Sequence, residues 1–378
     1  MENAIKPWQQ AISKLGIESL TTMQNDFFKK IDENENIVLL SPTGSGKTLA
    51  FLLPLLELLD PSSNKIEVLI ITPSRELALQ IEGVFKSLGT NFKANSCYGG
   101  HPFRTELNNF SSSPAVLIGT PGRISDHIRK ESFKTDGIHV LILDEFDKSL
   151  ELGFSSEMSF IISKLPNLKK RILSSATDIS MIPDFTGIRH FHKLNYLVEE
   201  SKSNNLSINV IKSENSDKLE CLFQLLCELG STNKLVFCNH RDAVERISRH
   251  LSDSGIVNDY FHGGLDQTER ERMLIRFRNG SSNVLITTDL ASRGIDIPEI
   301  SNVIHYQLPI NEASYIHRNG RTARMNSSGS SFLILAEDEL IPNYANAIYS
   351  SYKLRSTSIL PSFPDWETLI LEQEKRKR

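Results

Sequence analysis

The chain contains 378 residues, of which 39% are hydrophobic and 23% are charged, and its formal net charge is −4. This length allows two or three domains with separate cores, and the negative charge excludes a nucleic-acid partner held by bulk positive charge alone. The longest apolar run, from Leu49 to Leu59, is interrupted by Pro54 and Glu57 and is too short to cross a bilayer, so no membrane partner is expected. The N-terminus lacks the regions of a signal peptide, and the four cysteines form no Cys-x-x-Cys pair, so we expect a cytoplasmic protein.

The first periodic segment, from Trp8 to Leu20, carries apolar residues with the spacing of one helical face. After it, short apolar runs alternate with helical stretches, as in a parallel sheet whose strands are buried on both faces. The first domain, residues 1–198, is therefore predicted to be α/β. Its predicted strands are Ile37–Leu40, Val68–Ile71, Ala115–Ile118, Ile138–Leu143 and Ile172–Leu173.

A polar segment without apolar period, residues 199–206, predicts a linker. The alternation then resumes in residues 207–355, which predicts a second α/β domain and a cleft between the two. Residues 356–378 form a short tail that ends in Glu-Lys-Arg-Lys-Arg, either a solvated terminus or an arm that contacts RNA. The predicted strands of the second domain are Ile208–Ile211, Leu235–Cys238, Val284–Ile286, Val303–Ile304 and Phe332–Leu335.

The segment after the first predicted strand, from Ser41 to Thr48, has the composition of a phosphate-binding loop. Its glycines let backbone N–H groups surround an anion, the next helix adds the positive end of its dipole, and Lys47 places a charge against terminal phosphates. The general pattern opens with Gly six residues before the lysine, where this chain has Ser41. A glycine turn between a strand and a helix is the alternative, but the coincidence of strand, glycines, Lys-Thr and apolar helix favours a nucleotide site. The residues predicted to bind the nucleotide here are Thr43, Gly44, Ser45, Gly46, Lys47 and Thr48.

An ATPase also needs a carboxylate for Mg²⁺ and a base for the attacking water. The apolar run that ends at Leu143 is followed by two acidic residues. Asp144 would hold Mg²⁺ together with Thr48, and Glu145 would accept the proton of the water. An acidic turn after a strand is the alternative. Asp147, two residues further on, is expected to relay between sites rather than to contact the metal.

These residues and several further segments, in the same order, resemble the DEAD-box ATP-dependent RNA helicases of helicase superfamily two. The resemblance runs from about Gly16 to Arg324 and implies two tandem RecA-like domains, each a mostly parallel sheet flanked by helices. The segment Gly16–Gln24 resembles the family's adenine-binding motif, in which Gln24 would hydrogen-bond the base.

The resemblance also implies roles at the ribose and at the γ-phosphate of ATP. Asp296 would bind the ATP ribose. Arg321 and Arg324 lie three apart, so on a helix they share a face and both point across the cleft at the γ-phosphate. The implied catalytic residues are thus Lys47, Glu145, Arg321 and Arg324, and those that would couple hydrolysis to unwinding are Asp147, Ser175, Thr177 and His317.

Segments of both domains match the family's RNA-binding motifs. Thr120, Gly122 and Arg123 combine a hydroxyl, an open backbone and a guanidinium fork, which suits phosphate oxygens more than base edges. The implied RNA contact is therefore largely independent of sequence. The residues implied to contact RNA are Pro73, Arg75, Gly99, Gly100, Thr120, Gly122 and Arg123 in the first domain, and Gln267, Arg270 and Thr288 in the second.

The sequence departs from the family pattern at four places. The acidic motif reads Asp-Glu-Phe-Asp, with Phe146 in place of the usual Ala, which leaves its carboxylates intact. Leu20 replaces a usual Pro in the adenine motif, and Ala323 replaces a usual Gly in the arginine motif, where Ala would suit a helix better. The family carries an aromatic residue well upstream of Gly16, for which this N-terminus has no room, and Trp8 is the candidate substitute.

The predicted function is that of an ATP-dependent RNA helicase with ATP and Mg²⁺ as cofactors. It would couple ATP binding and hydrolysis to clamping and local unwinding of RNA duplexes or to remodelling of RNA–protein complexes, and it is expected to be a monomer. One alternative is a DNA helicase or translocase of the same fold. The other is a non-catalytic ATP-dependent RNA clamp. The intact catalytic residues argue against it, namely Lys47, Glu145, Arg321 and Arg324. The sequence specifies neither a physiological RNA nor a protein partner, and ribosome assembly, RNA decay and cold adaptation are all compatible with it.

Overall fold

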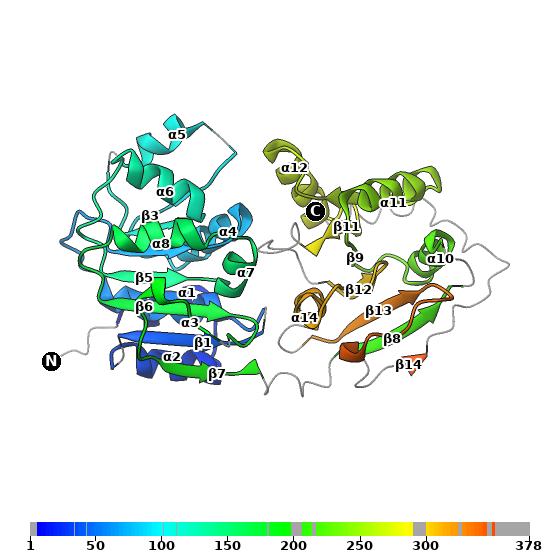
Figure 1. Cartoon of the computed structure of the whole chain (residues 1–378), viewed down its shortest axis with the longest axis horizontal. Coiled ribbons are helices and arrows are strands. Elements are labelled where there is room, and N and C mark those ends of the chain that lie inside the picture. The colour runs from blue at the N-terminus through cyan, green and yellow to red at the C-terminus, as the bar shows by residue number, and fades with distance from the viewer. Residues whose placement is uncertain are drawn as a thin grey trace. The chain divides into compact units, whose positions relative to one another are not determined.

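The computed structural model describes residues 6–33, 35–42, 44–100, 102–110, 112–179, 181–197, 206–213, 217–289, 300–323, 327–345 and 350–351. These residues form two compact units, of which the first contains the described residues up to 197 and the second contains those from 206 onward. Each unit has a sheet with helices packed on it (Figure 1). Each sheet has seven strands, and each unit has hydrophobic clusters of its own. Of the predicted linker, only Leu206 is described, and it is the first residue of a strand in the second unit.

The first unit is built on seven parallel strands in the order β3-β4-β2-β5-β6-β1-β7. Its inner strands include continuous apolar runs because both faces of the sheet are covered. The edge strands β3 and β7 carry more polar residues. The strands are β1 (Asn36–Leu40), β2 (Val68–Ile71), β3 (Ala94–Cys97), β4 (Val116–Gly119), β5 (Val140–Leu143), β6 (Lys170–Ser175) and β7 (His192–Asn195).

Helices cover both faces of this sheet (Figure 1). Alternate side chains of a strand point to opposite faces, so Ile70 packs with α1 to α4 and Leu69 packs with α6 to α8. Two short 3₁₀ helices span Asn108–Phe110 and Asp184–Thr186. The α-helices are α1 (Pro7–Lys14), α2 (Thr22–Ile31), α3 (Lys47–Leu58), α4 (Arg75–Ser87), α5 (Phe103–Leu107), α6 (Pro121–Arg129), α7 (Phe146–Glu151) and α8 (Ser155–Ser163).

The first helix is shorter than its periodicity predicts. α1 ends at Lys14, and Gly16 adopts a φ of +66°, a left-handed conformation that terminates helices. The next helix begins only at Thr22, where the hydroxyl of Thr21 accepts a hydrogen bond from the N–H of Gln24. The prediction of one helical segment from Trp8 to Leu20 is therefore wrong beyond Lys14.

The second unit repeats this architecture with parallel strands in the order β10-β11-β9-β12-β13-β8-β14. α10 and α11 pack on one face of the sheet, and Tyr315 of α14 packs against the opposite face with Leu333 and Leu335. Among all described residues, no helix combines the length and apolarity needed to span a bilayer. The strands are β8 (Leu206–Lys212), β9 (Lys234–Cys238), β10 (Asp259–Phe261), β11 (Val284–Thr288), β12 (Asn302–His305), β13 (Gly329–Leu335) and β14 (Ser350–Ser351); the helices are α10 (Leu219–Glu228), α11 (Arg241–Asp253), α12 (Gln267–Arg278), α14 (Glu312–Asn319) and the 3₁₀ turn Asn343–Ala345.

Candidate nucleotide and RNA sites

The loop between β1 and α3 has the backbone of a phosphate cradle. Gly44 and Gly46 adopt φ values of +88° and +89°, in the left-handed region that glycine enters without strain. Lys47 is the first residue of α3 and is buried. Its Nζ donates to the carbonyl oxygens of Ser41 (2.5 Å) and Pro42 (2.7 Å). Carbonyls of the loop thus hold the lysine, and phosphate oxygens, which carry more negative charge, would compete for it.

The departure at Ser41 has a structural role in the loop. Its hydroxyl donates to the hydroxyl of Ser45 at 2.7 Å, and both residues are buried. A serine thus braces the start of the loop where the general pattern has glycine. Thr48 follows in the first turn of α3, whereas Thr43, also predicted to contact the nucleotide, lies outside the described residues.

The residue predicted to bind the base lies beside this loop. Gln24 is buried in the first turn of α2, and its Nε2 donates to the carbonyl oxygen of Gly46 at 3.2 Å. Its Oε1 accepts from the N–H of Thr21 at 3.0 Å, while the hydroxyl of Thr21 accepts from the N–H of Gln24. This capping box fixes the amide next to the glycine loop, and the departure at Leu20 leaves it intact.

The acidic residues lie at a strand end close to the loop. β6 lies between β1 and β5 in the sheet, and Asp144 directly follows β5. Asp144 is only 3% exposed. Burial raises the pKa of its carboxyl group, whereas a hydrogen bond from Ser174 and the charge of Lys47 lower that pKa. The structure therefore brings the phosphate loop and the acidic strand together.

Glu145 has an uncommon backbone conformation for a residue with a side chain. Its φ and ψ are +47° and +51°, and it directly precedes the first residue of α7. Its N–H donates to the hydroxyl of Ser174 at 3.3 Å. Strained backbone of this kind concentrates at functional sites, which supports the predicted role of Glu145 as the general base.

Ser174 is a residue of this site that the sequence motifs do not include. Its buried hydroxyl donates to the carboxylate of Asp144 and accepts from the N–H of Glu145. It therefore contacts the predicted metal-binding carboxylate of Asp144 and the backbone of the predicted general base, Glu145. The signal present in the sequence is its place, one residue before the predicted coupling segment that starts at Ser175.

The predicted coupling residues of the first unit contact one another. The hydroxyl of Thr177 donates to the carboxylate of Asp147 at 2.8 Å, and the hydroxyl of Ser175 donates to the carbonyl oxygen of Thr177 at 2.6 Å. Asp147 lies in the first turn of α7, and Thr177 lies just beyond β6. This contact joins the acidic motif to the coupling segment, as a relay between sites requires.

The donor atoms at this edge of the sheet fit Mg²⁺. Asp144 supplies carboxylate oxygens and Thr48, at the start of α3, supplies a hydroxyl, and hard oxygen ligands are those that Mg²⁺ prefers. Burial disfavours the ionised form of Asp144, and a divalent cation beside it would stabilise that form.

Three predicted RNA segments lie at neighbouring strand ends of the first unit. β3, β4 and β2 are adjacent in the sheet, and each is followed within two residues by one of these segments. Because the carboxyl ends of parallel strands share one edge, the segments lie at the edge that also carries the phosphate loop. The segments start at Gly99 after β3, at Thr120 after β4 and at Pro73 after β2.

Contacts within these segments explain their glycines. A Cβ on Gly100, whose φ is +103°, would overlap the guanidinium group of Arg75, and one on Gly99 would touch it. Gly122 faces open space instead. Pro73 is buried, so an RNA contact from it would come from its backbone carbonyl rather than from its ring.

In the second unit, the predicted RNA residues lie beyond or at the ends of β10 and β11, which are neighbours in the sheet. The guanidinium of Arg270, near the start of α12, lies 5.0 Å from the ring centroid of Phe261. Thr288 is the last residue of β11 and is half-buried. Gln267 begins α12, but its side chain lies outside what the structure describes.

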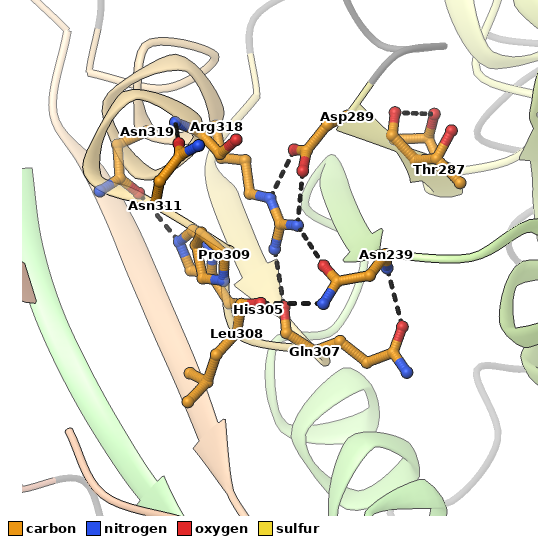
Figure 2. Close-up of polar contacts among 12 residues, drawn as sticks. Asn239, Thr287, Asp289, His305, Gln307, Leu308, Pro309, Asn311, Arg318 and Asn319 are labelled. Carbon is orange, nitrogen blue, oxygen red and sulfur yellow. Dashed lines mark hydrogen bonds and ion pairs between the residues drawn. The ribbon is translucent and has the colours of Figure 1, made fainter. Parts of the chain in front are cut away.

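The family's arginine motif corresponds to residues 317–324 of this chain, and its Arg318 is buried in α14 (Figure 2). Its Nε and Nη2 donate to the two carboxylate oxygens of Asp289 at 2.6 and 2.8 Å. Nη2 also donates to Oδ1 of Asn239, and Nη1 donates to the carbonyl oxygen of Gln307, both at 2.7 Å. These partners lie just beyond β11, β9 and β12, so Arg318 ties α14 to three strand ends.

The helical placement predicted for Arg321 is wrong. α14 ends at Asn319, and the N–H of Arg321 donates to the carbonyl oxygen of Arg318 at 3.1 Å in the turn that follows. Ala323 then adopts a φ of +52°, where glycine avoids strain, so the expectation that alanine suits a helix here is also wrong. Arg324 lies outside the described residues, and so the position that it takes beside Arg321 stays a prediction.

The remaining predicted residues are placed as follows. His317 and Arg321 are both buried in or just after α14. Asp296, predicted to bind the ribose, lies outside the described residues.

Phe146 is fully buried with its ring centroid 6.4 Å from that of Phe185, so the change in the acidic motif is one of core packing. Trp8 packs on Phe28 with ring centroids 4.8 Å apart, and its role as the substitute aromatic stays a prediction.

Two family models match the chain. The DEAD/DEAH box helicase model matches residues 21–184, and the helicase conserved C-terminal domain model matches residues 217–326. The chain is 33% identical over 333 residues to the ATP-dependent RNA helicase eIF4A of Debaryomyces hansenii. The matched stretch covers 86% of this chain and 83% of that protein. It is 31% identical over 372 residues to the ATP-dependent RNA helicase CshA of Listeria monocytogenes, covering 96% of this chain and 70% of that protein.

Solved structures share the fold. The DEAD-box helicase Mss116 bound to ssRNA and UDP-BeF matches with a TM-score of 0.82 at 26% identity, over 98% of this chain and 81% of that one. Dbp5 of S. cerevisiae bound to RNA and ADP BeF3 matches with a TM-score of 0.83 at 24% identity, over 99% of this chain and 97% of that one, and here the likeness concerns the fold alone. The predicted fold class, two tandem parallel α/β domains of the RecA-like type, is confirmed.

Proposed function

The chain belongs to the DEAD-box family of RNA helicases, and from this membership we propose that it is an ATP-dependent RNA helicase. It couples ATP binding and hydrolysis to clamping and local unwinding of RNA duplexes or to remodelling of RNA–protein complexes. The observation that carries this proposal is one edge of the first sheet, which bears the phosphate loop, the acidic residues and three RNA-directed segments. ATP and RNA then both bind at the carboxyl ends of strands in the same sheet.

The residues of the first unit take different parts in ATP hydrolysis. The N–H groups of the glycine loop and Lys47 bind the phosphates, and the lysine exchanges loop carbonyls for phosphate oxygens. Asp144 and Thr48 would hold Mg²⁺, which would supply positive charge against the phosphates of ATP. Glu145 accepts the proton of the attacking water, and Gln24 hydrogen-bonds the base.

Hydrolysis also needs the second unit. Lys47 and Asp144 belong to the first unit, whereas Arg321 belongs to the second. We propose that this arginine stabilises the charge of the transferred phosphoryl group, as arginine fingers do in related phosphoryl transfers. RNA then stimulates turnover by favouring the arrangement in which both units act on ATP.

The RNA contact is directed at the backbone. Arg75, Thr120 and Arg123 offer guanidinium and hydroxyl donors, which suit phosphate oxygens. The affinity therefore falls as salt increases and varies little among RNA sequences of one length. A strong preference for one sequence would instead require a base-reading surface.

We also propose that the protein acts as a monomer in the cytoplasm. Its four cysteines are free thiols, which supports a reducing compartment. Sedimentation velocity at micromolar concentration measures the oligomeric state directly, and a dimer there would contradict the proposal.

The test of the function is ATP hydrolysis by the full chain with RNA and with DNA of the same sequence. RNA stimulates hydrolysis more than DNA does, because contacts to the 2′-hydroxyl groups distinguish the two. Equal or greater stimulation by DNA would favour a DNA helicase. RNA binding that depends on ATP but shows no turnover would favour a non-catalytic clamp.

Two variants separate ATP binding from chemistry. Lys47→Ala weakens ATP binding, whereas Glu145→Gln retains ATP binding and lowers turnover by roughly 10²–10⁴-fold, the typical contribution of a general base. Lys29→Ala, which removes an exposed lysine of α2, is the control. Equal loss of ATP binding in the Lys47 and Glu145 variants would contradict the assigned roles.

A further inference from the structure

Glu106 is a buried carboxylate that no sequence motif of this chain includes. It lies in the short helix α5, between the glycine pair after β3 and the arginine-bearing helix α6, and is 1% exposed. Burying a carboxylate is costly unless its oxygens are paired with donors. Its partners therefore indicate what it is for.

The carboxylate of Glu106 joins two of the predicted RNA segments. Its Oε1 accepts a hydrogen bond from the N–H of Tyr98 at 2.8 Å, directly before the glycine pair. Its Oε2 lies 2.6 Å from Nε2 of His127 and 3.2 Å from Nη1 of Arg123. Arg123 and His127 are four residues apart, so they lie on one face of α6. One anion thus fixes the start of the glycine segment and the predicted RNA-binding arginine.

Aromatic rings enclose this group of charges. Phe103 stacks on His127 with ring centroids 4.1 Å apart and planes at 24°, and Phe110 contacts the same imidazole edge-on. The guanidinium of Arg123 lies 5.6 Å from the ring centroid of Phe103. Only 11% of the Arg123 side chain is exposed. In such a low-dielectric setting a charged hydrogen bond is strong, and the loss of one partner is correspondingly costly.

The glycine pair is held from its other side as well. The guanidinium of Arg75 packs against Gly99 and Gly100, while the preceding residue, Tyr98, is held by Glu106. The three RNA segments of the first unit are therefore connected through Arg75 on one side and Glu106 on the other. This arrangement requires no bound ligand to order it.

A metal ion is the alternative use of the same residues. The ligand atoms of Cys97, Glu106 and His127 lie within 4.8 Å of one another, and all three residues are buried. However, the Glu106 carboxylate already faces the positive charge of Arg123. Burial, the largest cause, raises the pKa of the Cys97 thiol far above its ordinary value, so a metal ion would have to displace the thiol proton as it bound. The geometry therefore favours an ion pair over a metal site.

We propose that Glu106 is a positioning residue, which presets Arg123 and the glycine pair as a rigid surface for RNA phosphates. The inference rests on the proposed role of Arg123 in RNA binding. A preset arginine need not be ordered when RNA binds, and the affinity gains what that ordering would otherwise cost. Glu106 itself does not contact RNA, and its effect passes through Arg123.

The test compares RNA binding by variants of the full chain. Glu106→Leu removes both acceptor oxygens at similar size, Glu106→Gln retains one, and Arg123→Ala removes the arginine. Asp126→Asn, on an exposed position of the same helix, is the control. Binding of fluorescent single-stranded RNA is measured by anisotropy with a non-hydrolysable ATP analogue, together with the RNA dependence of ATP hydrolysis.

The expected pattern has four parts. Arg123→Ala weakens RNA binding about tenfold or more, as loss of a charged hydrogen bond does. Glu106→Leu matches it, Glu106→Gln lies between it and the parent chain, and the control is unchanged. The double variant Glu106→Leu with Arg123→Ala is no weaker than either single one, because both remove the same contact. The kcat at saturating RNA and the ATP affinity without RNA are unchanged in the Glu106 variants.

The outcomes distinguish this inference from the proposed function. Unchanged RNA binding by Arg123→Ala would contradict the RNA role of Arg123 itself. A weakened Arg123 variant beside normal or tighter binding by both Glu106 variants would overturn the inference, because Glu106 would then mask the arginine rather than position it. Additive losses of RNA affinity in the double variant would overturn the inference as well. So would one equivalent of zinc in the purified parent chain that is absent from Glu106→Leu. If Glu106→Leu does not fold, the Glu106→Gln variant decides. An RNA dependence of ATP hydrolysis in Glu106→Gln equal to that of the parent chain would overturn the inference.

Discussion

The two units each place an aspartate directly after a parallel strand, and they hold it in different ways. Asp144, after β5, accepts a hydrogen bond from the hydroxyl of Ser174, which is neutral. Asp289, after β11, is held by two donors of the Arg318 guanidinium, which carries a full positive charge (Figure 2). The first carboxylate can still accept a cation, which would stabilise the ionised form that burial disfavours, whereas the second is neutralised within the fold.

This difference distinguishes charged groups that can bind a ligand from charged groups that are paired within the protein and stabilise its fold. A carboxylate held by a hydroxyl is oriented and can still bind a cation. Lys47, held by neutral carbonyls of its loop, can likewise still bind phosphate. Arg318 instead donates hydrogen bonds from Nε, Nη1 and Nη2 to acceptor groups of the second unit itself. We therefore expect Arg318 to act on structure and Arg321 to act on ATP.

The largest expected effect separates these two arginines. Arg321→Ala lowers RNA-stimulated turnover by roughly 10³–10⁵-fold, the usual contribution of an arginine finger, and leaves ATP bound through the first unit. Because Arg321 is buried, the unfolding temperature of the variant is measured beside that of the parent chain. Turnover is measured at saturating RNA, and ATP affinity with a fluorescent analogue. A loss of stability that accounts for the loss of activity would place Arg321 with Arg318 and remove the distinction.

Replacing Arg318 tests the structural half of the comparison. Arg318→Met leaves Asp289 without its guanidinium partner, and we expect the free energy of unfolding to fall by about 3 kcal/mol, the low end for a broken buried pair because Asp289 is partly exposed. The control is Arg246→Met, whose ion pair with Asp217 is exposed and contributes less than about 1 kcal/mol. Urea unfolding of both variants measures the difference. Equally small losses in the free energy of unfolding of both variants would show that the hydrogen bonds of Arg318 do not stabilise the fold.

His305 reports on the electrostatics of the same network. It is buried in β12, and its Nε2 lies 3.1 Å from the side-chain oxygens of Asn319 and Ser331. Burial, followed by the charge of Arg318, lowers the pKa of its imidazole to about 3. The unfolded chain, with an ordinary pKa of 6.5, binds more protons, so stability is lost as pH falls from 6.5 toward 3. This amounts to about 2 kcal/mol between pH 6.5 and 5.

The measurement is urea unfolding of the parent chain and of His305→Asn at pH 7 and pH 5. Asparagine retains a polar side chain but does not titrate, so the loss of stability between the two pH values is smaller by about 2 kcal/mol in the variant. An unchanged pH difference would show that other groups carry it and that the Arg318 region does not hold this imidazole neutral.

Much of the fold could be predicted from the sequence because inner parallel strands are continuous apolar runs. Val68–Ile71 coincides with β2, and Ile37–Leu40 differs from β1 by one residue. The edge strands β3 and β7 were not predicted, because strands with one open edge are free to carry polar residues. The start of β13, which reads Gly-Ser-Ser, was missed for its lack of apolar residues.

The site was predictable where its chemistry lies in one short segment. Lys47 and Asp144 each stand in such a segment, and the structure brings them together. Glu106, Ser174 and Arg318 act through partners that come from other strands and helices, and no local pattern specifies those partners. The helix expected at Arg321 failed for a related reason. α14 ends at Asn319, before Arg321, and a spacing of three residues between two arginines does not show where a helix ends.

The smallest expected effect concerns the hydroxyl that orients Asp144. Ser174→Ala removes the donor to the Asp144 carboxylate and the acceptor for the N–H of Glu145, and a hydrogen bond of this kind contributes about 1 kcal/mol. We expect the affinity for a fluorescent nucleotide to weaken about fivefold with Mg²⁺ and to stay unchanged with EDTA, since the hydroxyl acts through the metal-binding carboxylate. Ser174→Thr, which retains a hydroxyl, restores most of the affinity. Tighter Mg²⁺-dependent binding in Ser174→Ala would mean that the hydroxyl competes with the metal, and Asp144 would then resemble Asp289 in being held by the fold.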